Sequence, residues 1–211
     1  MILPFFPLNL VPFPTERLNL HIFETRYKQL IKECLREKKT FGILPFINNS
    51  IATIGTEMQL VQIYREYLDG RMDIETRGIR RFKIISFENP LAGKLYAGGS
   101  VEFLEDENLS HADLWLTEQL ISLVKELYQI LQVSIAINAE QATFLSYQLA
   151  HRVGLSIEQE YELLGLPTEI ERQMYLVEHL KHAIPIVKEI ERTKSLIRMN
   201  GHFKRFDPLN F

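Results

Sequence analysis

The pattern of apolar residues changes once along this chain, near residue 105, and this change constrains the fold more than any other feature. Residues 54–104 hold short apolar runs separated by turn signals, which is typical of strands in a small barrel or sandwich. After the polar stretch 106–108, apolar residues recur at helical spacing. The predicted division is a β-rich lobe at 1–105, an α-helical lobe at 110–200 and a tail at 201–211.

The start of the chain contains four prolines, at positions 4, 7, 12 and 14. Because proline fixes φ and lacks a backbone donor, we expect a strand here to lie at a sheet edge or to break into short pieces. Apolar and polar residues alternate from Leu18 to Ile22, as in a half-buried strand. The stripe that follows, from Tyr27 to Leu35, has helical spacing and predicts a helix at 25–38. One helix inserted among strands makes the fold class α+β.

Three further signals divide the β-rich lobe. The run 41–47 reads as a strand. Asp69-Gly70 predicts a two-residue hairpin turn, in which both central residues need φ > 0. Arg77-Gly78 marks a second break, where Gly78 would adopt a positive φ, and residues 94–104 form the last strand.

The helical lobe carries start and stop signals. A possible capping residue precedes an acidic or amide residue by three positions at Ser110, Asn138, Ser156 and Thr168. Gly154 and Gly165, each followed by leucine, predict left-handed helix ends. The predicted helices are 111–133, 139–153, 157–164 and 168–199, and Pro185 should kink the last of them.

Composition narrows the possible environment. Hydrophobic residues make up 46% and charged residues 24% of the chain, and the net charge of −3 gives no bulk attraction to nucleic acid or anionic membrane. The only cysteine, Cys34, lies on the apolar side of the predicted helix, so we expect an inert core thiol in a reducing compartment. No secretory signal and no apolar run of membrane-spanning length is evident, which predicts a cytoplasmic protein.

Two stretches resemble a known family: P-L-N-L-V-P-F-P at 7–14 and L-x-L-H-I-F-E-x-R-Y-x-x-L at 18–30. Together with F-G-I-L at 41–44 and L-L-x-x-x-x-x-x-x-R at 163–172, they resemble the N-terminal substrate-binding domain of Lon, the ATP-dependent protease La. The resemblance is to proteins that consist of this domain alone. It implies a PUA-like β lobe followed by a helical lobe.

The resemblance implies binding of unfolded or extended polypeptide, in the manner of an adaptor to a protease or chaperone. A Walker A sequence, which ATP hydrolysis by Lon needs, does not occur, and the serine–lysine protease domain has no counterpart. We therefore predict a protein that is not an enzyme and needs no cofactor. Phe5, Phe6 and Phe13 are the candidate peptide-binding residues, because apolar side chains beside proline-broken edge strands could capture an extended chain.

Other polar residues have both a functional and a structural interpretation. Arg77, Arg80 and Arg81 could contact phosphates in an RNA-binding module, although a solvated strand edge explains them as well. Glu24 suits a helix start, with Arg26 paired to a carboxylate. The spacing of His179 and His182 permits metal chelation, but no further ligands are evident and we predict no metal site. A small-molecule enzyme with its site in a crevice between the lobes is a third possibility.

Overall fold

The computed structural model describes residues 1–105, 114–137 and 144–202. Its residues form two compact units. The first comprises the described residues of Met1–Leu109 and Tyr147–Thr168, and the second those of Ser110–Ser146 and Glu169–Phe211. The segment 147–168 thus groups with the β-rich unit, whereas the sequence-based boundary placed it in the helical lobe. The predicted caps at Ser110 and Asn138, and residues 203–211 of the tail, lie outside the described residues.

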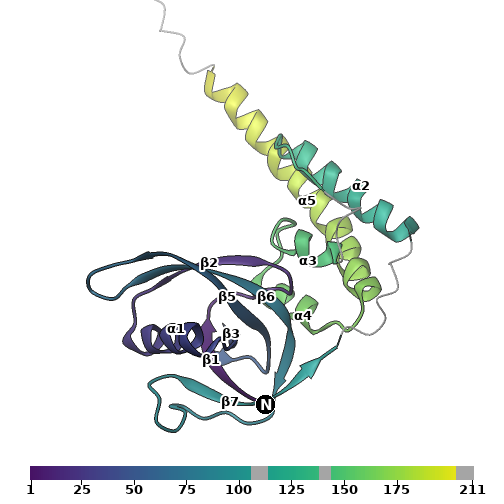
Figure 1. Ribbon diagram of the computed structural model, residues 1–211. Coiled ribbons are helices and arrows are strands. Elements are labelled where there is room, and N and C mark those ends of the chain that lie inside the picture. Colours follow the sequence, from purple (N-terminus) through teal and green to yellow (C-terminus); the bar gives the residue numbers. More distant parts are fainter. Residues whose placement is uncertain (106–113, 138–143, 203–211) are drawn as a thin grey trace, which may run out of the picture. The chain divides into compact units, whose positions relative to one another are not determined.

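Strands of the first unit close into a barrel (Figure 1). In spatial order, β1 pairs with β7, β7 with β6, β6 with β5, β5 with β3, and β3 again with β1, while β2 adds to β6 and β4 to β3. Only the pairing of β1 with β3 is parallel among these. The strands are β1 (Ile2–Leu8), β2 (Arg17–Ile22), β3 (Phe41–Ile47), β4 (Ser50–Ile51), β5 (Ile54–Glu66), β6 (Met72–Ile84) and β7 (Ala97–Leu104). The predicted α+β fold is confirmed.

Strand β1 differs from the predicted edge strand, because it has partners on both sides. Its first half pairs with β7 and its second half with β3, and the change occurs at Phe5, which pairs with both. Each of Pro4 and Pro7 therefore lies where the strand has only one neighbour. A missing N–H is tolerated at such a position, which is why two prolines fit into one continuous strand.

Two glycines in the β5–β6 region act differently from their predicted roles. Asp69-Gly70 belongs to the five-residue connection 67–71, in which Gly70 N–H donates to the Tyr67 carbonyl and Gly70 alone has positive φ, at 79°. Gly78 lies inside the continuous strand β6 without a positive φ. A Cβ atom there would lie 2.1 Å from the Phe13 carbonyl oxygen, so Gly78 permits a close approach of two backbones rather than a turn.

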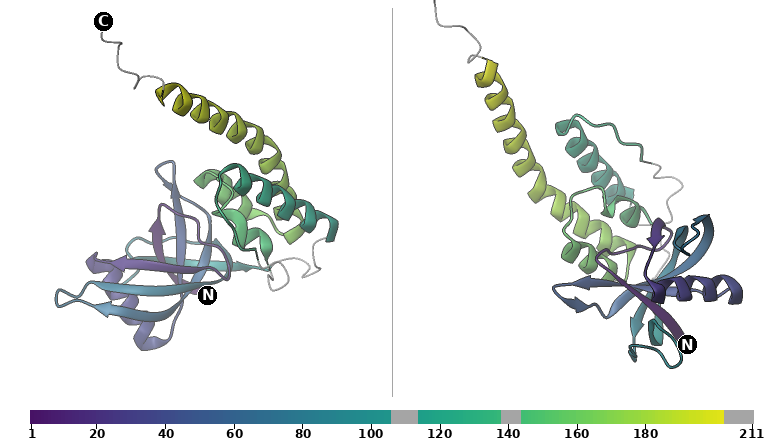
Figure 2. Two further views of the ribbon diagram at one scale, coloured as in Figure 1. Left: turned by 90° about the horizontal axis from the view of Figure 1, so that it is seen from above. Right: turned by 90° about the vertical axis from the view of Figure 1, so that its left-hand side faces the viewer.

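Helix α1 (Thr25–Glu37) packs its buried face, from Tyr27 to Cys34, against residues of the barrel core (Figure 2). Lys38, with a φ of 52°, ends the helix in a left-handed conformation. Helix α4 (Ile157–Gly165) begins with the predicted capping box, because Ser156 accepts from Gln159 N–H and the Gln159 side chain accepts from Ser156 N–H. Gly154 has the predicted positive φ, but Gly165 is helical and does not end α4 with a left-handed residue.

The second unit is built on α2 (Leu114–Ile130) and α5 (Glu169–His202), which pack together. Leucine and valine side chains spaced by three and four residues on α2 are buried, as are those between Leu176 and Ile184 on α5. Helix α5 contains Pro185 and changes direction along its length in Figure 2, as the missing N–H predicts. The short helix α3 (Leu145–Ala150) begins in this unit, but its residues from Tyr147 onward belong to the first unit. Within the described residues, no helix is long and apolar enough to cross a membrane.

Candidate peptide-binding site

The three phenylalanines predicted to contact a peptide lie inside the barrel unit. Phe5 and Phe13 are fully buried and Phe6 nearly so. Phe5 stacks on Phe82, Phe6 on Tyr27, and Phe13 on Tyr147. Phe5 and Phe6 point to opposite faces of β1 and lie in two different core clusters. Because all three rings are buried, they build the core and do not offer a surface to a ligand. The opening stretch contributes to a binding surface in another way, through the residues that follow Phe6.

A cavity of about 360 Å³ opens beside the end of β1 and the start of α1. We call it the Arg26 cavity. Its walls come from segments far apart in the sequence and comprise Pro7, Leu8, Asn9, Arg26, Tyr27, Phe46, Ile51, Phe87, Asn89 and Ala97. Residues of both family-like stretches, 7–14 and 18–30, therefore meet in one place, because β1 ends where α1 begins.

Aromatic side chains form the apolar part of the Arg26 cavity, whose wall also carries polar side chains. Phe46 and Phe87 remain 38% and 40% exposed. Phe87 is held in place because its ring stacks on the buried Phe5 at a centroid distance of 5.9 Å. The exposed parts of the two rings thus form an apolar rim that a ligand side chain could contact.

The first residues of α1 bring polar side chains to the Arg26 cavity. Glu24 is the N-cap residue of α1, but its carboxylate does not accept from the helix amides as the sequence suggested. Instead, the carboxylate accepts from Arg26 Nε at 2.8 Å, and the Arg26 guanidinium lies 4.5 Å from the centre of the Tyr27 ring. Burial raises the pKa of Tyr27, so its phenol stays protonated at neutral pH. Arg26 therefore lies at the cavity between a carboxylate and an aromatic face.

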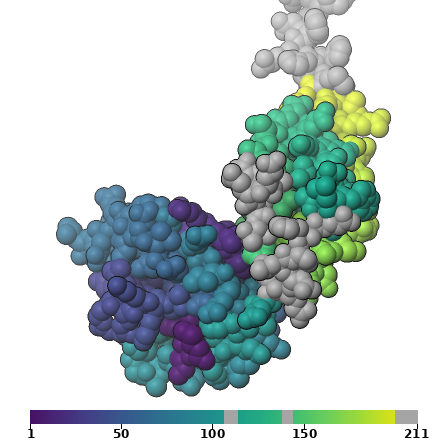
Figure 3. Space-filling view, turned by 45° about the vertical axis from the view of Figure 1, so that its right-hand side comes forward, coloured from purple at the N-terminus to yellow at the C-terminus, as the bar shows by residue number. Residues whose placement is uncertain are grey.

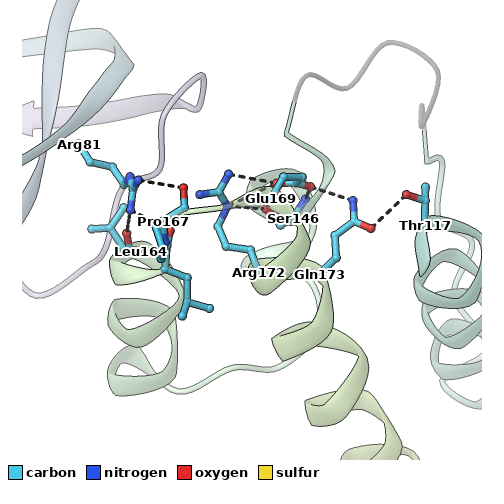
Figure 4. A network of polar contacts seen from close by, with 9 residues as sticks. Arg81, Thr117, Ser146, Leu164, Pro167, Glu169, Arg172 and Gln173 are labelled. Atoms are coloured by element: carbon cyan, nitrogen blue, oxygen red, sulfur yellow. Dashed lines mark hydrogen bonds and ion pairs between the residues drawn. The ribbon is translucent and has the colours of Figure 1, made fainter. Parts of the chain in front are cut away.

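The arginines considered for RNA binding do not form one exposed cationic patch. Arg81 is buried and donates to the carbonyl oxygens of Leu164 and Leu166 at 2.9 and 2.8 Å, which fixes the end of α4 (Figure 4). Arg80 donates to the buried carboxylate of Glu57 and lies over the ring of Phe103. Only Arg77 of the three keeps an exposed side chain without such a role in fixing the barrel. Sequence proximity could not show this, because the contacts are long-range.

The remaining sequence candidates are placed as follows. Cys34 is buried, and burial raises the pKa of its thiol to about 12, which keeps it protonated and unreactive. His182 is exposed and bonds the Glu178 carbonyl through Nδ1. No group of three or more potential metal-ligating side chains gathers among the described residues.

Arg172, the last residue of the L-L…R stretch, is fully buried in the second unit (Figure 4). It donates to Glu169 Oε2 at 3.3 Å, and Ser146 and Gln173 donate to the same carboxylate at 2.6 and 2.9 Å. Thr117 of α2 in turn donates to Gln173. This arginine therefore holds the helices of its unit together and does not face a ligand.

Comparison with known protein families shows to which family the chain belongs. Residues 2–182 match the model of the ATP-dependent protease La (LON) substrate-binding domain. The chain belongs to this family. A Lon N-terminal domain protein from Xanthomonas campestris has a similar structure, with a TM-score of 0.67 and 26% identity over 84% of this chain and 98% of that one. The N-terminal domain of the Mycobacterium avium complex Lon protease shares the fold, with a TM-score of 0.65, 15% identity and coverage of 86% and 98%.

Both family-like stretches contribute residues to the Arg26 cavity. In this chain they supply the end of β1, most of β2 and the start of α1, and residues 7–9, 26 and 27 of these stretches line the Arg26 cavity. The sequence signal that could have located the cavity was therefore the pairing of P-L-N with E-x-R-Y. The contribution of Phe46 and Phe87 had no such signal, since neither lies in those stretches.

Proposed function

We propose that this chain is a non-enzymatic protein that captures unfolded or extended polypeptide in the Arg26 cavity and presents it to a protease or chaperone partner. The observation that carries the proposal is the rim of two exposed phenylalanines around a cavity of about 360 Å³. Apolar burial tolerates many sequences, because it needs no fixed hydrogen-bond pattern. Membership of a substrate-binding family supports polypeptide as the ligand.

Binding of fluorescein-labelled β-casein, followed by fluorescence anisotropy, tests capture. We expect binding that persists when salt is raised from about 50 to about 500 mM, since apolar contacts are not screened. A short labelled RNA serves as the second probe. RNA binding that falls steeply with salt, without casein binding, would overturn the proposal in favour of a nucleic-acid module.

The double variant Phe46→Ser/Phe87→Ser locates the site. We expect it to bind casein at least about tenfold more weakly, because loss of two partly buried aromatic contacts removes more than about 1.4 kcal/mol. Phe23→Ser is the matched control, since Phe23 is 61% exposed and does not line the cavity. Equal losses in both variants would show that exposed aromatic residues act non-specifically. Circular dichroism confirms that each variant is folded.

Presentation to a partner is a separate step. Cross-linking in cells followed by affinity purification should recover a protease or a chaperone together with client polypeptides. Recovery of clients alone would leave capture in place and overturn delivery.

A further inference from the structure

The polar side chains of the Arg26 cavity narrow the class of polypeptide that it can bind. Among the described residues that line the cavity, Arg26 carries the only charge, and Asn9 and Asn89 supply amide groups. Figure 3 shows that the purple start of the chain, the indigo of α1 and the teal of residues near 95 share one face of the first unit. We propose that the cavity binds the C-terminal residue of a polypeptide, with the α-carboxylate on Arg26 and an apolar side chain against Phe46 and Phe87. This inference rests on the proposed function.

The guanidinium of Arg26 keeps hydrogen-bond donors for a ligand. Its Nε and Nη2 atoms each lie 2.8 Å from Glu24 Oε2, so one edge of the planar group is occupied. Within the part of the chain that the structure describes, this side chain has no further hydrogen bond or ion pair, which leaves the edge formed by Nη1 and Nη2. A carboxylate can bind there through two parallel hydrogen bonds without displacing Glu24.

The charge at the cavity favours an anionic group over a cationic one. The described lining residues include no carboxylate, so a ligand ammonium group would meet Arg26 without a counter-charge. Glu24 does not line the cavity, and both members of its pair with Arg26 are at least 40% exposed. Water therefore screens the repulsion between Glu24 and a second carboxylate. The amides of Asn9 and Asn89 can donate to that carboxylate or accept from the last peptide N–H.

A chain end fits this arrangement better than an acidic residue inside a chain. In a C-terminal residue, the carboxylate and the side chain are attached to the same Cα atom, so both can enter one small cavity. In an extended chain, neighbouring side chains point to opposite faces, and the next one on the same face lies about 7 Å farther along. An internal aspartate would therefore bring its carboxylate without an apolar group at the same place. The cavity volume of about 360 Å³ suits one terminal residue, since ligand cavities range from about 300 to about 1,000 Å³.

The apolar part of the cavity specifies the side chain of that last residue. Leu8 and Ile51 add aliphatic groups to the walls beside Phe46 and Phe87, whose rings keep exposed surface. A large apolar side chain would bury this surface, whereas a terminal serine would not. The expected ligand is therefore a free C-terminus that ends in a residue such as leucine or phenylalanine.

Short synthetic peptides test the carboxylate. A glycine–serine peptide that ends in leucine and carries fluorescein at its N-terminus is compared with its C-terminal amide, and with an amide that contains an internal aspartate. By anisotropy, we expect the free acid to bind about tenfold more tightly than either amide, because charge-assisted bidentate hydrogen bonds are stronger than neutral ones. This advantage should shrink as salt rises from about 50 to about 500 mM.

Three outcomes of this comparison would overturn the inference or part of it. Equal binding of the free acid and the simple amide would overturn recognition of a carboxylate. Equal binding of the free acid and the aspartate-containing amide would overturn the assignment to a chain end. A free acid that ends in serine should bind as weakly as the amides, and binding equal to that of the leucine peptide would overturn the apolar part of the site.

Two variants separate this inference from the proposed function. Arg26→Gln should reduce the ratio of free-acid to amide affinity from about ten to about one, whereas Phe46→Ser should weaken both peptides and keep the ratio. Arg36→Gln is the matched control, because Arg36 lies on the same helix, has a side chain that is 71% exposed and does not line the cavity. An unchanged ratio in Arg26→Gln, or an equal fall in Arg36→Gln, would overturn the role of Arg26.

The same titrations show which of the two proposals fails. If leucine-ended peptides bind without a preference for the free acid, recognition of the chain end fails and capture in the Arg26 cavity stands. If neither these peptides nor casein binds, capture itself fails.

Discussion

Two arginines from family-like stretches show how differently the two units use the same side chain. Arg172, in the second unit, is fully buried and its guanidinium contacts Glu169, Ser146 and the Phe144 ring. Arg26, in the first unit, has a side chain that is 45% exposed, with a carboxylate two residues away as its partner. A buried charge depends on its partners because water cannot replace them, whereas an exposed pair can exchange partners at little cost. Burial therefore separates the arginine that maintains the fold from the one that can face a ligand.

The largest effect should come from breaking the buried network. Arg172→Leu leaves the Glu169 carboxylate buried with neutral donors only. We expect the free energy of unfolding to fall by about 3–5 kcal/mol, the usual cost of an uncompensated buried charge. Urea denaturation followed by far-ultraviolet circular dichroism measures it.

Arg192→Leu is the matched control for Arg172→Leu. Arg192 lies on the same helix and pairs with Glu189 at 3.9 Å, but both side chains are more than 70% exposed. Its loss should change the free energy of unfolding by less than about 1 kcal/mol. Similar losses in the two variants would contradict the argument from burial.

The next effect concerns Gly78, where the barrel has no room for a side chain. Gly78→Val should destabilise the protein by about 2 kcal/mol or more, because a Cβ atom would overlap the Phe13 carbonyl oxygen and the backbones must separate. Thermal melting measures the effect. Gly165→Ala is the control: the nearest atom to its added Cβ would lie 3.9 Å away, and alanine favours the helix, so stability should stay equal or rise. An unchanged melting temperature for Gly78→Val would show that β6 can move away from residue 13.

Gly78 also shows how much of the structure could be predicted from the sequence. Local rules found the strand 41–47 and the capping box at Ser156, but the predicted break with a positive φ at Gly78 is wrong, because Gly78 lies inside β6. They failed where distant residues decide the outcome. Phe5 and Phe6 became buried on opposite faces of β1, whose pairing with β3 and β7 leaves neither face at a free edge, and the carbonyls at the end of α4 accept from Arg81. The sequence indicated only part of the Arg26 cavity. The P-L-N and E-x-R-Y stretches were recognised as family-like, whereas Phe46 and Phe87 come close to them only because the barrel closes.

His151 forms ion pairs whose exposure lies between that of Arg172 and that of Arg26. The pH dependence of stability can therefore test whether burial sets the strength of an ion pair. Glu16 and Glu160 flank its imidazole and raise its pKa to about 10. Since the folded pKa lies above the unfolded one, the stabilisation is complete below about pH 6.5 and disappears as the pH rises through about 10. His151→Gln should therefore be less stable than the parent by roughly 1–2 kcal/mol at pH 6, a modest value because the side chain is 38% exposed.

Urea denaturation of His151→Gln and the parent from pH 6 to pH 10 measures this difference. The two stabilities should converge at the alkaline end. A difference that does not change with pH would mean that the ring contact between His151 and Phe13, and not the imidazolium charge, carries the stabilisation.

The smallest effect is expected at Arg26, and it sharpens the comparison with Arg172 most directly. Arg26→Gln should change the free energy of unfolding by less than about 1 kcal/mol, because both members of the Glu24–Arg26 pair are at least 40% exposed. A double-mutant cycle with Glu24→Gln isolates the pair, and its coupling energy should be about 0.2–1 kcal/mol. A loss of several kcal/mol would show that the contact of Arg26 with the Tyr27 ring is part of the core, as the network of Arg172 is. Arg26 would then be a structural residue, and the apolar rim alone would remain available for a polypeptide.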